Sequence, residues 1–119
     1  MEITSEIKKD AYAVKFTAME NGKTAGWAYL YLIFQDRHEE PYGLMENVYV
    51  ESEFRSKGIG TQLVKLVIEE AKKRNCYKLI GNSNLDNTRA QALYERLGFR
   101  KYGIELRMDI KESKIKQKD

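Results

Sequence analysis

The succession of a strand, a basic glycine-containing turn, an amphipathic helix and a second strand constrains the fold of this chain more than any other feature. Residues 43–50 and 77–81 are rich in strand-favouring residues, and they flank a helical pattern over residues 58–74. The apolar positions of that helix form one stripe: Ile59, Leu63, Val64, Val67, Ile68 and Ala71. This order of elements predicts a right-handed parallel crossover.

A pair of strands joined by a tight turn is predicted before this unit. Residues 11–19 and 24–34 favour strands, and Asn21-Gly22 between them is the strongest short hairpin signal. Alternation along the second strand would put aromatic side chains on one face and core side chains on the other. These are Trp27, Tyr29 and Tyr31 against Ala28, Leu30 and Leu32. The aromatic face is a candidate lining for a ligand groove or a dimer contact.

A second helix and a last strand are predicted near the end of the chain. Asn87 is the expected N-cap of a helix over residues 88–97, and Gly98 is the expected left-handed residue after it. Residues 99–110 are interpreted as a last strand or a broken pair of strands, kinked at Gly103. We assign residues 1–110 to one domain and residues 111–119 to a lysine-rich tail.

Together these elements predict an α/β (α+β) fold with a central, mixed, mostly antiparallel sheet and helices packed on it. Hydrophobic residues make up 42% of the 119 residues and charged residues 33%, which is typical of a globular domain. The single cysteine fits a reducing cytoplasm. We expect no membrane span, because no run of about 18 apolar residues occurs, and no secretory signal is visible. The net charge of +3 is too small to indicate nucleic acid by itself.

The turn between residues 55 and 61 has the composition of an anion site. The first turn of a helix presents unpaired backbone N–H groups and the positive end of the helix dipole. Glycines at this point let phosphate oxygens approach the backbone, and basic side chains add full charges. The turn reads Arg55, Ser56, Lys57, Gly58, Ile59, Gly60 and Thr61. The pattern predicts a pyrophosphate site, and the alternative is a strand-to-helix turn that binds nothing.

Two other phosphate motifs do not fit the sequence. A P-loop needs a glycine five residues before Gly22-Lys23-Thr24, and that position is Thr17. A dinucleotide fingerprint starting at Gly58 needs glycine at position 63, which is Leu63.

The residues around this turn resemble the GNAT N-acetyltransferase superfamily. Arg55 to Gly60 matches its R-x-x-G-x-G motif, and the stretch from Asn87 to Phe99 is similar to its N-x-R-A…L-Y-E-x-x-G-F signature. The two motifs occur in order, separated by one helix and one strand, and the resemblance covers roughly residues 11–110. It implies an acyl-CoA N-acyltransferase-like fold with CoA in a gap where two strands of the sheet splay apart.

The resemblance also implies how acetyl-CoA, as cosubstrate, would be held. The amides of Lys57 to Thr61 would bind the pyrophosphate, and the backbone of Val48 and Val50 would pair with the pantetheine arm. The side chain of Asn87 would contact the same arm, and Tyr94 would lie near the sulfur. The two helices that precede the hairpin in this family have no counterpart here, since only about ten residues come before the first strand. The acceptor site would then be open or completed by a second subunit, which favours a homodimer.

Glu46 and Tyr94 are the candidate catalytic residues. An alkylammonium has a pKa of about 10, so a base is needed to give the neutral amine. Glu46 lies in the middle of a predicted strand, and Leu44-Met45-Glu46-Asn47 resembles the L-E-D stretch of polyamine acetyltransferases. Tyr94 is the candidate acid for the leaving thiolate, and a backbone N–H near Tyr49 is the candidate oxyanion donor. The alternatives are a solvent-facing or ion-paired glutamate and a half-buried helix tyrosine.

Two further residues carry no predicted chemistry. His38 is interpreted as a solvated loop residue, and Cys76 as packed and without partners for a metal site. The function predicted from the sequence is N-acetyl transfer to a small amine, a lysine side chain or a protein N-terminus. A CoA-binding sensor or scaffold without catalysis is the second interpretation. Nucleic-acid association through the lysines is the third, and Glu53, Glu69 and Glu70 argue against it by interrupting any basic stripe.

Overall fold

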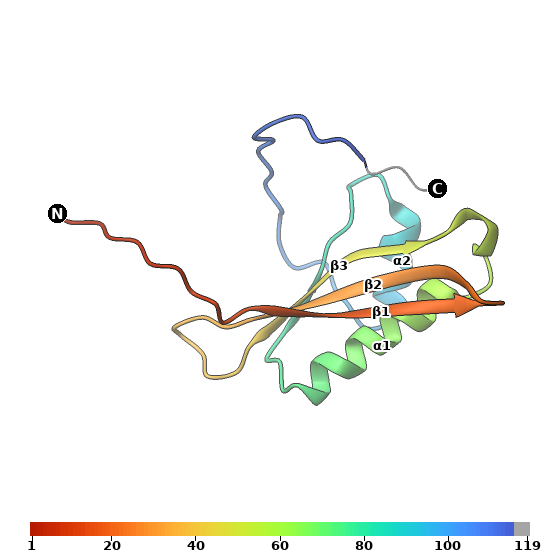
Figure 1. The fold of residues 1–119 in the computed structure, drawn as a ribbon, viewed down its shortest axis with the longest axis horizontal. Coiled ribbons are helices and arrows are strands. Elements are labelled where there is room, and N and C mark those ends of the chain that lie inside the picture. The colour runs from red at the N-terminus through yellow and green to blue at the C-terminus, as the bar shows by residue number, and fades with distance from the viewer. Residues whose placement is uncertain (116–119) are drawn as a thin grey trace.

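The computed structural model describes residues 1–115, and residues 12–96 contain a single sheet with helices packed on it (Figure 1). The elements in chain order are β1 (Tyr12–Glu20), β2 (Lys23–Ile33), β3 (Tyr42–Val50), a 3₁₀ turn η1 (Ser52–Phe54), α1 (Ile59–Lys73), β4 (Leu79–Gly81) and α2 (Thr88–Arg96). The sheet order is β1-β2-β3-β4, and only the β3–β4 pair is parallel. The predicted mixed, mostly antiparallel sheet is therefore confirmed.

The hairpin between β1 and β2 turns at the residues predicted from the sequence. Asn21 and Gly22 have φ values of 51° and 76°, so both lie in the left-handed region that a tight type I′ turn requires. The strands then pair in register from Glu20↔Lys23 to Tyr12↔Leu32, with one bulge next to Ala18.

The core lies between one face of the sheet and α1. Alternate side chains of β2 are fully buried there, and the buried stripe of α1 covers them. The cluster consists of Ala25, Ala28, Leu30, Leu32, Met45, Phe54, Ile59, Leu63, Val64, Val67 and Ala71. The predicted division of β2 into a core face and an aromatic face is confirmed.

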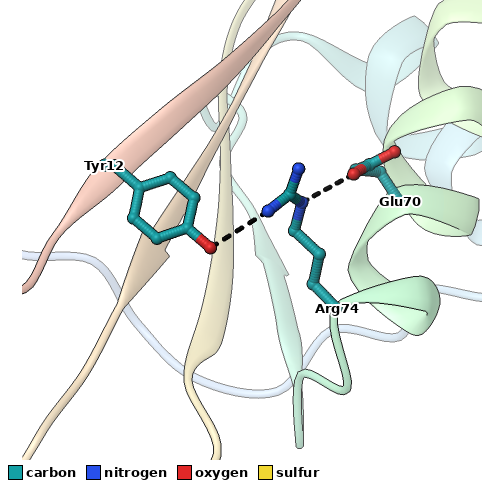
Figure 2. Close-up of polar contacts among 3 residues, drawn as sticks. All are labelled: Tyr12, Glu70 and Arg74. Atoms are coloured by element: carbon teal, nitrogen blue, oxygen red, sulfur yellow. Dashed lines mark hydrogen bonds and ion pairs between the residues drawn. The ribbon is translucent and has the colours of Figure 1, made fainter.

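Polar contacts tie the end of α1 to the edge strand β1 (Figure 2). Arg74 follows the last turn of α1, and its Nε donates to Glu70 Oε2 at 2.6 Å while its Nη1 donates to Tyr12 Oη at 3.1 Å. The guanidinium carbon also lies 5.6 Å from the centroid of the Tyr12 ring. These contacts join elements that are 62 residues apart in sequence.

The strands β3 and β4 pair over only three residues and then diverge. Their ladder runs from Gly43↔Leu79 to Met45↔Gly81, whereas β3 continues to Val50. A bulge in β3 lies at this point, because Tyr29 is opposite Glu46 but Trp27 is opposite Tyr49. Asn47 within the bulge has a φ of 54°. The sheet therefore opens along the second half of β3.

The prediction of a last strand over residues 99–110 is wrong. No residue from 99 to 110 has regular secondary structure, and the segment loops away from the sheet (Figure 1). Its apolar side chains at alternate positions from Tyr102 to Ile110 are more than 80% exposed. Alternation specifies a strand only where a neighbouring strand supplies hydrogen bonds and packing, and no described strand pairs with this segment. Residues 116–119 of the predicted tail lie outside the described residues.

Candidate functional site

A cleft of about 450 Å³ occupies the place where β3 and β4 diverge. One side is the second half of β3, and the other is the loop after β4 together with α2. The lining residues are Met45, Glu46, Asn47, Val48, Asn82, Ser83, Asn84, Asn87, Ala90, Tyr94 and Glu105. Four predicted site residues, Glu46, Val48, Asn87 and Tyr94, therefore face one cleft.

Glu46 is half-buried in this cleft and held by one hydrogen bond. Asn82 Nδ2 donates to Glu46 Oε1 at 3.0 Å. A carboxylate fixed through one oxygen keeps its other oxygen for a second partner. Glu46 is thus neither ion-paired within the described residues nor simply facing solvent, and its position suits proton transfer.

Tyr94 is half-buried on the opposite wall and interacts electrostatically with Glu46. Burial, and then the negative charge of Glu46, raise the pKa of the Tyr94 phenol above its ordinary value. The phenol therefore stays protonated through neutral and mildly alkaline pH. A protonated phenol beside a carboxylate supplies an acid and a base to one cleft.

Hydrogen bonds at the two ends of α2 hold in place the residues that this helix contributes to the cleft. Asn87 caps the helix, because its Oδ1 accepts a hydrogen bond from the backbone N–H of Ala90 at 3.1 Å. At the other end Gly98, with a φ of 110°, allows the Phe99 N–H to reach the Tyr94 carbonyl at 3.0 Å. The predicted cap residues are confirmed. Because Oδ1 of Asn87 already accepts this bond, its amide NH₂ group is the better placed to meet a ligand.

The turn before α1 has the geometry of an anion site. Gly58 is the N-cap with a φ of 80°, and it provides no side-chain acceptor for the first helical N–H groups. The first turn of α1 contains no acidic residue. Ser56 also has a positive φ, of 65°. The amides at the start of α1 therefore remain unpaired by side chains and lie at the positive end of the helix dipole.

The basic side chains of this turn are partly used within the protein. Arg55 Nε donates to the Val50 carbonyl at 2.9 Å, and its guanidinium lies 5.5 Å from the centroid of the Tyr49 ring. Lys57 Nζ lies 5.5 Å from the centroid of the Phe54 ring. Arg55 therefore anchors the turn to the end of β3, a role that the motif alone did not reveal. The Val50 carbonyl is already bonded, so Val48, which lines the cleft, is better placed to meet a ligand.

Several residues of the site were not found from the sequence. Asn82, Ser83 and Asn84 follow β4, and the Asn84 carbonyl accepts a hydrogen bond from Gln91 Nε2 of α2 at 2.8 Å. The signal available was a polar run directly after a buried strand. Gly26 was also missed: a Cβ there would lie 2.5 Å from the Tyr49 carbonyl oxygen, so only glycine lets β3 approach β2 so closely.

The residues interpreted as inert lie away from the cleft. His38 is exposed and stacks on Tyr77, with ring centroids 3.8 Å apart. Cys76 is partly buried against the core, and burial raises the pKa of its thiol. Across residues 1–115 no group of three or more metal-ligating side chains is found. No helix in this part of the chain is long and apolar enough to cross a membrane.

The sequence and the fold were compared with those of known proteins. A model of the acetyltransferase (GNAT) family matches residues 2–99. Glucosamine 6-phosphate N-acetyltransferase of Trypanosoma brucei brucei is 32% identical over 68 residues, which cover 57% of this chain and 44% of that protein. N-alpha-acetyltransferase 30 of Schizosaccharomyces pombe is 29% identical over 89 residues, covering 73% of this chain and 57% of that one.

The fold of this chain is also similar to the folds of solved protein structures. A solved structure of a putative acetyltransferase from Agrobacterium tumefaciens superimposes with a TM-score of 0.71 at 33% identity. The match covers 81% of this chain and 69% of that one. The chain spans about half the length of the two curated relatives described above.

Proposed function

This chain belongs to the acetyltransferase (GNAT) family, and on that premise we propose that it transfers the acetyl group of acetyl-CoA to a primary amine. The observation that carries the proposal is the pairing of Glu46 and Tyr94 across one cleft. Burial and Glu46 keep the Tyr94 phenol protonated, while Asn82 orients the carboxylate. Both groups lie where the sheet opens, next to the backbone of β3.

The residues of the cleft can carry out each proton movement of the reaction. Glu46 accepts a proton from the ammonium group of the acceptor, directly or through water, and leaves a nucleophilic amine. The amine nitrogen then bonds to the acetyl carbon as the carbon–sulfur bond of the thioester breaks. Tyr94 donates its proton to the departing sulfur, and the acylated nitrogen then gives its second proton to the Tyr94 phenolate. The products are an N-acetyl amine and free CoA thiol, and Glu46 returns its proton to solvent.

The two ends of the cosubstrate have different supports in the protein. The amides from Lys57 to Thr61 would hold the pyrophosphate at the start of α1, whose first turn contains no acidic residue. The Val48 backbone and the Asn87 amide would contact the pantetheine arm along the cleft. The arm would thus replace the missing neighbour of β3 beyond Met45, as an added strand does.

A CoA-binding module without catalysis is the competing function. Both functions predict CoA binding, so only chemistry separates them. The test follows release of free thiol from acetyl-CoA in the presence of polyamines, amino acids, aminoglycosides, amino sugars and peptides. Thiol release that depends on one of these amines supports the enzyme, and CoA binding without any such release supports the module.

Glu46→Gln is expected to lower kcat/KM at neutral pH by on the order of 10²-fold, because an amide cannot accept the ammonium proton. The substitution keeps the size of the side chain and an oxygen for Asn82. The loss should shrink as the pH approaches about 10, where the acceptor supplies its own neutral amine. A pH profile of kcat/KM for both proteins measures this.

The control for Glu46→Gln is Glu69→Gln, which changes an exposed glutamate of α1. It should match the wild type at every pH. Equal pH profiles for Glu46→Gln and the wild type would show that Glu46 is not the base.

The protein is also expected to form a homodimer through the Tyr31 end of the aromatic face of β2. Tyr29 and Tyr31 stack with ring centroids 5.9 Å apart, and Tyr31 is 38% exposed. Two-fold pairing is the commonest way for a protein to cover such a surface. A contact centred on Tyr31 would place the second subunit beside the acceptor side of the cleft. Light scattering at micromolar concentration should give twice 13.9 kDa, and Tyr31→Glu should shift the mass toward one chain.

A mass near 13.9 kDa for the wild type across the concentration range would contradict the dimer. Unchanged dimerisation of Tyr31→Glu would show that the dimer contact lies on another face.

A further inference from the structure

The face of the sheet turned away from α1 carries two opposite charges on one line across three strands. Lys15 of β1 is paired with Tyr29 of β2, and Tyr29 is paired with Glu46 of β3. Side chains directly opposite one another in antiparallel strands share a face. The Lys15, Tyr29 and Glu46 side chains therefore form one cross-strand row, which we call the Lys15–Glu46 row.

Among the described residues, this row contains the only charged side chains in the middle of the three long strands. The three long strands hold four charged residues, and two of them, Glu20 and Lys23, face each other at the hairpin turn. The remaining two are Lys15 and Glu46. The neighbours of Lys15 in β1, Val14 and Phe16, pack instead on the core side. One cation and one anion thus stand on the same face, separated by an aromatic ring.

Strand pairing sets the separation of the two backbones that carry the charges. Paired residues in antiparallel strands have Cα atoms about 5 Å apart, so two steps place the Lys15 and Glu46 backbones about 10 Å apart. The Lys15 ammonium leans over the aromatic residues, with Nζ 5.5 Å from the centroids of both Trp27 and Tyr29. No carboxylate lies within ion-pair distance of it in the described part of the chain. Lys15 is held in place yet keeps its charge for another partner.

The Glu46 end of the row carries negative charge. Glu46 and Glu105 both line the cleft, and no lysine or arginine among residues 1–115 does. An ammonium group is attracted to this end and a phosphate or carboxylate is repelled from it. The Lys15 end attracts an anion, and the Tyr29 side chain between them offers an apolar surface for a ring or an alkyl chain.

From this charge complementarity we infer that the acceptor is an amine whose carbon skeleton also carries an anionic group several bonds away, and that Lys15 binds this group. The inference rests on the proposed acetyl transfer and names the class of its acceptor. The amine would meet Glu46, the body of the acceptor would lie on Tyr29, and a phosphate or carboxylate would meet the Lys15 ammonium. An amino sugar phosphate or an aminoalkyl phosphate carries its amine and its anion far enough apart to meet side chains whose backbones lie about 10 Å apart.

The test uses matched acceptors that differ only in the anionic group. Glucosamine 6-phosphate is compared with glucosamine, and an aminopentyl phosphate with aminopentanol; cadaverine serves as a dication of similar length. The anionic member of at least one pair should have a kcat/KM about tenfold higher or more, through a lower KM at similar kcat. Cadaverine should be a poorer acceptor than the aminopentyl phosphate.

Variants of Lys15 then assign the preference to this residue. Lys15→Ala should raise the KM for the anionic acceptor about tenfold and so remove the difference between the paired acceptors. Lys15→Arg should keep most of the difference, because it keeps the charge. Lys65→Ala, which removes an exposed lysine of α1, should keep all of it. Calorimetric binding of the paired acceptors to the CoA complex gives the same comparison without turnover.

The outcomes separate this inference from the proposed function. Acetylation of the neutral amines or of cadaverine with no gain from an anion would overturn the inference and leave acetyl transfer standing. A preference for the anion that persists in Lys15→Ala would show that Lys15 does not bind the anionic group. CoA binding without acetylation of any acceptor would overturn acetyl transfer and, with it, the assignment of the acceptor.

Discussion

Gly60→Asp is expected to abolish CoA binding while leaving the fold intact. Gly60 lies in the first turn of α1, where unpaired backbone amides would meet the pyrophosphate. The substitution places a negative charge and a side chain at that point. The fold should tolerate it, because a Cβ at Gly60 would meet only Val50 Cγ2, at an ordinary distance of 3.7 Å. Titration calorimetry with CoA measures the loss, and circular dichroism checks the fold.

Gly103→Asp is the matched control for this prediction. It introduces the same charge at a glycine with no neighbouring atom within 4 Å, outside the cleft and the turn. Its affinity for CoA should equal that of the wild type. If Gly60→Asp also bound CoA with unchanged affinity, the turn from Arg55 to Thr61 would not be the pyrophosphate site.

Tyr94→Phe is expected to keep CoA binding and lower kcat by on the order of 10²–10⁴-fold. The change removes only the phenolic oxygen, and the ring can still pack on Phe99, whose centroid is 5.6 Å away. Because burial and Glu46 raise the pKa of Tyr94, the wild type should keep the acid protonated to a higher pH than free tyrosine. Its kcat should therefore not fall on the alkaline side until above about 10, and Tyr94→Phe should show no such fall.

The measurement for Tyr94 is kcat under conditions in which the chemical step limits the rate. Tyr77→Phe is the control, since Tyr77 is an exposed tyrosine outside the cleft. A kcat for Tyr94→Phe equal to that of the wild type would show that another group protonates the sulfur.

The sequence predicted those parts of the fold that local physics determines. The Asn21-Gly22 turn, the apolar stripe of the first helix and the Asn87 and Gly98 caps each specify a local structure, and all were confirmed. The segment over residues 99–110 has equally clear alternation but forms no strand. A strand also needs a neighbour to pair with, and sequence periodicity carries no information about that neighbour.

In the candidate site, too, the features that depend on single elements were predicted and the contacts between elements were not. Glycine spacing and motif order located the turn before α1 and Tyr94. The mid-strand position of Glu46 and the resemblance of its neighbours to a stretch of polyamine acetyltransferases pointed to that residue. The Glu46–Asn82 hydrogen bond and the Lys15–Glu46 row depend on which residues meet across the sheet. The register of the strands and the bulge at Asn47 determine those contacts, and neither was predicted from the sequence.

The most direct test of acetyl transfer uses acetyl-CoA that carries an isotopic label in its acetyl group. The purified protein is mixed with this compound and an amine acceptor, and the amine is analysed by mass spectrometry. We predict that the label appears on the amine nitrogen in the presence of the wild type and is strongly reduced with the Glu46→Gln, Tyr94→Phe double variant. Tight CoA binding with no label on any amine, or equal labelling by both proteins, would contradict the account.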